Sequence, residues 1–217
     1  MHMHRLIEQF LALLLPDRCA GCGRAGTLLC DRCRASFVAY TGEPIRVADD
    51  LTDVGVAFVF EGPLRHALHQ LKYRRVRRVA RPLGALLATH LRTLPWPLDA
   101  LAPIPLHRQR LAERGFNQAE LLAREVAAIS GLPLIVGPLM RVKATRQQAL
   151  LDTPGRIENV ANAFIWNGTP PPARIALVDD VLTTGATVNA CARALRIAGT
   201  REVYALALAR SHRQHSR

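Results

Sequence analysis

Apolar and polar positions along the first half of the chain follow first a strand-like and then a helix-like period. Residues 54–60 are rich in β-forming side chains and predict a strand. Gly62-Pro63 then begins a segment with apolar residues at helical spacing, which predicts a helix carrying Leu64, Ala67, Leu68 and Leu71 on one face. A second helix is predicted over residues 82–94.

From residue 99 onward strand-like and helix-like segments alternate. Helices are predicted from Asn117 to the stop at Gly131 and over residues 187–198. The predicted strands cover 101–106, 134–136, 175–178 and 203–209. The 175–178 strand is wholly apolar, as in the middle of a parallel sheet. We therefore expect an α/β fold with an open, mainly parallel sheet, whose ligands bind at the carboxyl ends of the strands.

Four cysteines lie close together near the beginning of the chain. They form two C-x-x-C pairs, a spacing that suits a tetrahedral zinc site of Cys19, Cys22, Cys30 and Cys33. Disulfides would need an oxidising compartment, and a thioredoxin-like redox motif usually has one such pair. We expect structural zinc in a small module with a leading helix, residues 1–45, followed by the main domain, residues 46–217.

The net charge of +12 comes almost entirely from arginine, since only two of the 29 basic residues are lysine. Arginine pairs well with phosphate, so the charge predicts a polyanionic or phosphorylated partner. Basic residues are densest in a run that is either a solvated face or a nucleic-acid contact, formed by Lys72, Arg74, Arg75, Arg77 and Arg78. No apolar run is long enough to cross a bilayer and no secretory leader is recognisable, which predicts a cytoplasmic protein without membrane insertion.

The segment that follows the 175–178 strand carries the most chemistry. Two carboxylates, Asp179 and Asp180, are expected at the end of this strand, where both could accept hydrogen bonds from a vicinal diol such as that of ribose. The loop after them leads directly into a helix, so its backbone N–H groups and hydroxyls could bind a phosphate monoester through Thr183, Thr184, Gly185, Ala186 and Thr187. The competing interpretation is a helix cap with carboxylates that meet nearby arginines.

These thirteen residues, 175–187, resemble at every position the phosphoribosyl pyrophosphate motif of type I phosphoribosyltransferases. Three further stretches resemble the ComF subfamily of competence-associated, phosphoribosyltransferase-like proteins: residues 103–120, 60–73 and 145–159. The cysteine cluster is also typical of that group, although many relatives have a longer, doubled cysteine-rich ribbon.

The resemblance implies binding of phosphoribosyl pyrophosphate with Mg²⁺, with Asp179 and Asp180 in the catalytic role at the ribose. It implies pyrophosphate contacts, in a loop joining a strand end to a helix start, from Arg114, Gly115, Phe116 and Asn117. The aperiodic stretch after residue 140 is either an ordinary surface loop or a flap over the site, with Arg141, Lys143 and Arg146.

Two functions are consistent with this pattern. In the first, the protein takes part in competence and DNA uptake, binds single-stranded DNA through its arginine-rich segment and meets other competence proteins. In the second, it is an active phosphoribosyltransferase of base or nucleotide salvage with no role in DNA handling. The acceptor for such a transfer is not legible in the sequence.

Overall fold

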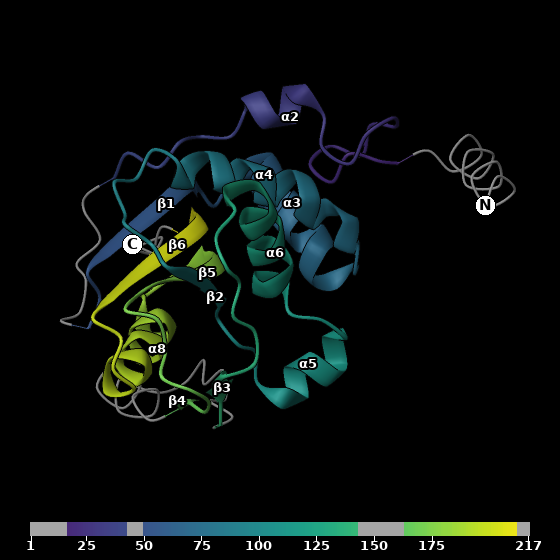
Figure 1. The fold of residues 1–217 in the computed structure, drawn as a ribbon. Coiled ribbons are helices and arrows are strands. Elements are labelled where there is room, and N and C mark those ends of the chain that lie inside the picture. Colours follow the sequence, from purple (N-terminus) through teal and green to yellow (C-terminus); the bar gives the residue numbers. More distant parts are fainter. Residues whose placement is uncertain (1–16, 43–49, 143–162, 212–217) are drawn as a thin grey trace, which may run out of the picture.

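A computed structural model describes residues 17–42, 50–142 and 163–211 of the chain (Figure 1). The leading helix and the flap residues Lys143 and Arg146 lie outside the described residues. The main sheet has four parallel strands in the order β1-β6-β5-β2. Their bounds are β1 Asp53–Val59, β6 Glu202–Arg210, β5 Arg174–Leu182 and β2 Ala100–Pro103. The predicted open parallel sheet is confirmed.

Helices cover both faces of this sheet (Figure 1). On one face lie α3 (Gly62–Tyr73), α4 (Ala80–Leu91) and α6 (Gln118–Ser130), and on the other lies α8 (Ala186–Ile197). Successive residues of β5 alternate between the two cores: Ala176 and Val178 face the three-helix layer, whereas Ile175 and Leu177 pack in the core with α8. This alternation decides where the polar residues later in the same strand point.

The ends of α6 agree with the sequence pattern. The Asn117 side chain accepts a hydrogen bond from the Ala119 N–H at 3.0 Å, which caps the first turn. At the other end Gly131 adopts the left-handed conformation with φ of 75° and closes the helix through its N–H to the Ala127 carbonyl. This fixes the start of α6 beside the end of β2, since the Asn117 side chain also donates to the Ile104 carbonyl at 2.9 Å.

The structure differs from the sequence-based expectations in three places. A helix that the pattern did not predict, α5 (Arg108–Arg114), follows β2, and none of its residues is buried. The predicted strand 134–136 is reduced to one parallel bridge between Leu101 and Leu134. Two three-residue strands, β3 (Leu139–Arg141) and β4 (Phe164–Trp166), form a separate antiparallel pair that contacts α8.

The described part of the cysteine-rich segment packs directly on the main domain. Its short helix α2 (Asp31–Ala35) contacts α3, and Cys19, Leu29 and Cys33 belong to the same buried cluster as Leu64 of α3. Asp17 pairs with Arg78 at 2.8 Å. The division at residue 45 stays a prediction, but residues 17–42 share their core with the rest of the chain. Within the described ranges, no helix is both long and apolar enough to span a membrane.

Candidate functional site: a thiolate cluster and a phosphate-binding loop

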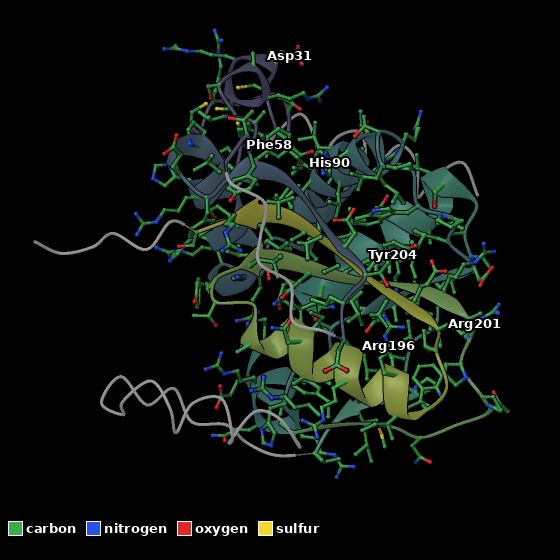
Figure 2. All side chains as sticks on the ribbon, turned by 90° about the vertical axis from the view of Figure 1, so that its left-hand side faces the viewer. Asp31, Phe58, His90, Arg196, Arg201 and Tyr204 are labelled. Carbon is green, nitrogen blue, oxygen red and sulfur yellow. The ribbon has the colours of Figure 1, made fainter. Side chains whose placement is uncertain are left out.

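The four predicted cysteine ligands converge in space beside α2, where sulfur atoms gather near Asp31 (Figure 2). All four Sγ atoms lie within 4.8 Å of one another, and those of Cys22 and Cys30 are 3.8 Å apart. Four thiolates around one zinc ion at Zn–S distances of about 2.3 Å have edges of roughly 3.8 Å. The cluster therefore fits a single tetrahedral ion.

Backbone geometry shapes the first cysteine knuckle. The Cys30 N–H donates to the Cys19 Sγ at 3.3 Å, and Gly23 adopts φ of 78° as its N–H closes on the Cys19 carbonyl. Sequence reasoning missed Gly21, where a Cβ would lie 2.9 Å from the Cys33 Sγ. A side chain at residue 21 would therefore push into the position of a ligand.

The thiols of this cluster differ in their proton affinity. Burial opposes ionisation of Cys19, but the backbone N–H groups of Cys30, Cys22 and Gly21 outweigh it and lower its pKa to about 6. Burial and the neighbouring thiols raise the pKa of Cys33. Four thiolates at such close range repel one another. A divalent cation bound among them offsets this repulsion and so stabilises the fully ionised cluster.

The two carboxylates of β5 point to opposite faces of the sheet, which corrects the expectation that both lie where the chain turns. The strand continues to Leu182 because it stays paired with β6, as in the register of Asp179 with Ala207 and of Val181 with Ala209. Asp179 therefore points toward α8, where burial and then the charge of Asp179 raise the pKa of Cys191, and Asp180 points toward α3 and α6.

Asp180 is held by two polar partners inside the three-helix layer. It is 2% exposed, forms an ion pair with Lys72 of α3 and accepts a hydrogen bond from the Gln118 side chain at 3.1 Å. Gln118 in turn accepts a hydrogen bond from Arg114. A continuous polar chain thus connects the carboxylate with the loop predicted to contact pyrophosphate. Sequence reasoning did not identify Lys72 and Gln118 as members of this chain.

Asp179 has a different environment. It keeps part of its surface exposed, and its carboxylate accepts a hydrogen bond from the Asp180 N–H at 2.8 Å. Burial of the carboxylate and the negative charge of Asp180 raise the pKa of Asp179 well above its ordinary value. Adjacent carboxylates with such different surroundings are suited to different tasks.

The loop after β5 has the geometry that a phosphate-binding loop needs. Thr183 and Thr184 are exposed, Gly185 adopts φ of 80°, and α8 begins at the next residue, so its first backbone N–H groups face the loop. The Thr184 hydroxyl accepts from the Ala186 N–H at 3.3 Å, which tightens the turn. Thr187 follows in the first turn of the helix. A strand, a loop and a helix follow one another as predicted, although the strand continues past its predicted end at residue 178 to Leu182 and the helix begins at Ala186 instead of Thr187.

Residues 114–117 lie between two helices, which corrects the prediction of a loop that joins a strand directly to a helix. Arg114 is the last residue of α5, Gly115 ends that helix with φ of 78°, and Asn117 caps α6. Phe116 is buried, and the Arg77 guanidinium lies 4.8 Å from its ring centre. These residues are at the carboxyl end of β2, next to the β5 carboxylates in the sheet order.

The arginine-rich segment after α3 is largely engaged in contacts with the protein itself. Lys72 pairs with Asp180, Arg75 and Arg77 donate to the carbonyls of Glu113 and Gly115, and Arg78 pairs with Asp17. Arg74 is exposed. Arg75 even adopts a left-handed backbone conformation with φ of 57°. All four arginines of the segment are exposed, and three of them are also held by contacts with Asp17 and with the carbonyls of residues 113 and 115.

Of the three residues predicted in the flap, the structure describes Arg141. It lies at the end of β3, with its guanidinium 5.4 Å from the centre of the Phe164 ring. Burial and the charge of Arg110 lower the pKa of Arg141.

Comparison with known proteins places the chain in a family. No family model matches it. It is 34% identical over 160 residues to Competence protein F of Haemophilus influenzae, covering 69% of each chain. It is 35% identical over 155 residues to the DNA utilization protein YhgH of Salmonella typhi, covering 69% of this chain and 68% of that protein. Among solved structures, adenine phosphoribosyltransferase from Leishmania tarentolae matches with a TM-score of 0.38 and 18% identity, over 60% of this chain and 56% of that one.

That TM-score is too low to support an argument about the fold. The fold is assigned from the topology of the parallel sheet itself. An open parallel sheet whose inner strand leads through two carboxylates and a hydroxyl-rich loop into a helix defines an α/β protein whose ligands bind at the carboxyl ends of the strands. The sequence relatives narrow this class: the chain belongs to the competence protein F (ComF) family.

Proposed function

We propose that the protein binds phosphoribosyl pyrophosphate as its Mg²⁺ complex and serves in the handling of DNA during competence. The observation that carries the first part is the junction of β5 with α8. Its exposed threonines, its left-handed Gly185 and the N-terminal end of a twelve-residue helix together form the proposed anion-binding loop beside two carboxylates.

Each part of the proposed site has a separate task. The Thr183–Thr187 loop binds the 5-phosphate, and Arg114 with the backbone at Gly115–Asn117 contacts the pyrophosphate. We propose that the ribose hydroxyls meet Asp179, which keeps part of its surface exposed, whereas Asp180 points to the opposite face of β5. Asp180 could contact the ribose only if the side chain of Lys72 or Gln118 moved away, because both oxygens of this carboxylate already have partners. Mg²⁺ bound to the pyrophosphate would partly neutralise the negative charge that this group carries when it leaves the C1 atom of the ribose.

The cysteine cluster is proposed to hold structural zinc through Cys19, Cys22, Cys30 and Cys33. Support comes from the compatible Sγ separations and from the N–H···S bond at Cys19. Zinc has no redox chemistry of its own, so this site would fix the position of residues 17–42 on α3 without taking part in a reaction.

Ligand-induced stabilisation tests the sugar diphosphate site. At a concentration 100 times its Kd the ligand adds about 2.7 kcal/mol, which raises the Tm of a chain of this size by roughly 5–10 °C. The Gly185→Val variant should lose this response. The matched control is Gly199→Val, since Gly199 also has a positive φ at the other end of α8 but lies away from the loop. A full response from Gly185→Val would exclude the loop as the phosphate site.

The role in DNA handling is supported by the names of the two relatives, a competence protein and a DNA utilization protein, and by the net charge of +12. We propose single-stranded DNA as the nucleic-acid ligand and other competence proteins as partners. The second candidate function is phosphoribosyl transfer to a base or amine, which the intact 175–187 segment favours. Release of pyrophosphate across a panel of bases distinguishes the two, because a protein that only binds the sugar diphosphate releases none.

A further inference from the structure

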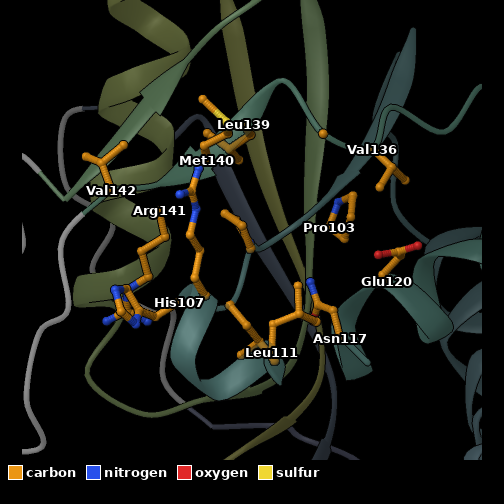
Figure 3. Close-up of a pocket in the computed structure, with 14 residues that line it drawn as sticks. Pro103, His107, Leu111, Asn117, Glu120, Val136, Leu139, Met140, Arg141 and Val142 are labelled. Carbon is orange, nitrogen blue, oxygen red and sulfur yellow. The ribbon is translucent and has the colours of Figure 1, made fainter. Parts of the chain in front are cut away.

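A cavity of about 440 Å³ lies beside the candidate site but is not lined by its phosphate loop or its carboxylates. It is enclosed by the end of β2, by α5, by the start of α6 and by residues 136–142 (Figure 3). Asn117 is shared between this cavity and the predicted pyrophosphate loop. Since β2 is an edge strand, the cavity is at the outer edge of the sheet. Its volume suits a small organic ligand and is too small for a polynucleotide.

Apolar side chains are concentrated at this cavity. Eight large apolar residues are exposed among the described residues, and three of them line it: Leu111, Val136 and Val142, with exposed fractions of 42, 42 and 49%. They come from two separate segments, α5 and the stretch around β3. Pro103 and Met140 add to the same wall. Such clustering of apolar surface around a hollow indicates a binding site more than it indicates random exposure.

The polar groups of the lining carry an excess of positive charge. Arg108 and Arg141 face a single carboxylate, Glu120, whose oxygen already accepts two hydrogen bonds from Arg124. Arg141 is oriented by the Phe164 ring, and its pKa is lowered by burial and by the charge of Arg110. A bound anion next to Arg141 would stabilise its charged form and so oppose the lowering of its pKa by burial and by Arg110. Figure 3 shows Met140 and Arg141 across the cavity from Asn117 and Glu120.

We propose that this cavity binds a flat aromatic anion about the size of a nucleobase or a fused-ring acid. The ring would pack against Leu111, Val136 and Met140, and the acidic group would meet Arg108 and Arg141. The proposed ligand is separate from the sugar diphosphate, and its site is a second one that adjoins the first through Asn117.

The test measures binding of anilinonaphthalene sulfonate, a fluorescent aromatic anion, to the full-length protein. Leu111→Asp should abolish binding because it removes apolar contact and adds a repelling charge. Arg108→Gln should weaken binding about tenfold, the usual value of a hydrogen bond to a charged group. Both residues are exposed, so the variants should keep their Tm. Ile197→Asp is the matched control, since Ile197 is 79% exposed on α8 and does not line the cavity.

Three results would overturn the proposal: unchanged binding by Leu111→Asp, equal losses in Leu111→Asp and Ile197→Asp, or a neutral ring analogue that binds as well as the sulfonate. Displacement of the dye by phosphoribosyl pyrophosphate with Mg²⁺, with the Gly185→Val variant also failing to bind the dye, would place the dye in the sugar site. That outcome contradicts the second site and leaves the proposed function intact. Failure of the sugar diphosphate to bind would contradict only the proposed function.

Discussion

Lys72 and Asp180, which are 108 residues apart in the sequence, form an ion pair that joins α3 to β5. The Asp180 carboxylate is almost fully buried, whereas the Lys72 side chain keeps 20% of its surface exposed. Because Gln118 accepts a hydrogen bond from Arg114 and donates one to the same carboxylate, the pair is one end of a polar chain that reaches the proposed pyrophosphate loop, residues 114–117. The conformation of that loop and the charge of Asp180 are therefore linked.

Substitution of Asp180 by Asn should destabilise the protein at neutral pH. It leaves the partly buried Lys72 ammonium without a counter-charge, which we expect to cost about 1–3 kcal/mol because partial exposure reduces the value for a fully buried pair. Chemical denaturation at pH 7 measures the loss. The Glu120→Gln variant is the control, since it removes an exposed i,i+4 pair with Arg124 and should cost under about 0.5 kcal/mol. Equal losses in the two variants would contradict the assigned role of Lys72.

Substitution of the adjacent Asp179 by Asn should have the opposite effect. The folded-state pKa of Asp179 is raised, so the stabilisation from its protonated form is present below the ordinary pKa of the carboxyl and is lost as pH rises through the folded-state value. Asn mimics the protonated form at every pH. Asp179→Asn should therefore unfold at a higher temperature than the wild type at pH 7, and the two should unfold at the same temperature below about pH 3. A wild type that is more stable than the variant at pH 7 would show that Asp179 is not strained by burial.

Substitutions of Arg77 and of Arg74 should differ in their effect on sugar diphosphate binding. Arg77 donates to the Gly115 carbonyl at 2.8 Å and stacks on Phe116, so Arg77→Ala should loosen the loop and weaken sugar diphosphate binding by about tenfold. Lysine should not restore it, because the contact needs a planar guanidinium. Arg74 is exposed, and Arg74→Ala should leave the sugar diphosphate unaffected. Calorimetric titration of both variants makes the comparison, and equal effects would argue against a positioning role for Arg77.

Single-stranded DNA binding should depend steeply on salt. Each neutralised phosphate contributes a slope of about −0.7 to the plot of log affinity against log salt concentration. Arg74→Ala should reduce the magnitude of the total slope by roughly one such unit if Arg74 contacts a phosphate. Fluorescence anisotropy over a salt series measures both values. An affinity that does not change with salt would exclude the nucleic-acid role of this segment.

Removal of the proposed zinc ion should destabilise the main domain together with the cysteine-rich segment. Cys19 and Cys33 belong to the same buried cluster as Leu64 and Leu68 of α3, so loss of the ion exposes one side of that cluster. A chelator, or the Cys22→Ser variant, should lower the Tm of a single unfolding transition measured by circular dichroism. Two separate transitions, with the second at the original Tm, would show that residues 17–42 unfold without affecting the sheet.

The sequence predicted those features that depend on local pattern. Each of these features can be recognised from residues that are close together in the sequence. They are the apolar run at 175–178, the loop to α8, the caps at Asn117 and Gly131, and the spacing of the cysteines. Helix α5 was missed because it buries no residue and so has no apolar period to detect. The strands β3 and β4 are three residues long, too short for a period of two to be recognised.

The missing parts of the site depend on contacts between distant segments. Lys72 belongs to a run of cations in the sequence, and its pairing with Asp180 is decided by the packing of α3 on the sheet. The divergence of Asp179 and Asp180 follows from the extension of β5 to Leu182, which its pairing with β6 determines. Neither fact is encoded in the spacing of residues near the carboxylates.

The most direct test of the central claim is calorimetric titration of the full-length protein with phosphoribosyl pyrophosphate in the presence of Mg²⁺, for the wild type and for two threonine variants. Thr184→Val removes a hydroxyl from the proposed phosphate loop, whereas Thr89→Val removes one that bonds the Ala85 carbonyl within α4. We expect saturable binding that Thr184→Val weakens about tenfold and Thr89→Val leaves unchanged. Absence of binding by the wild type, or equal affinities in both variants, would contradict the central claim.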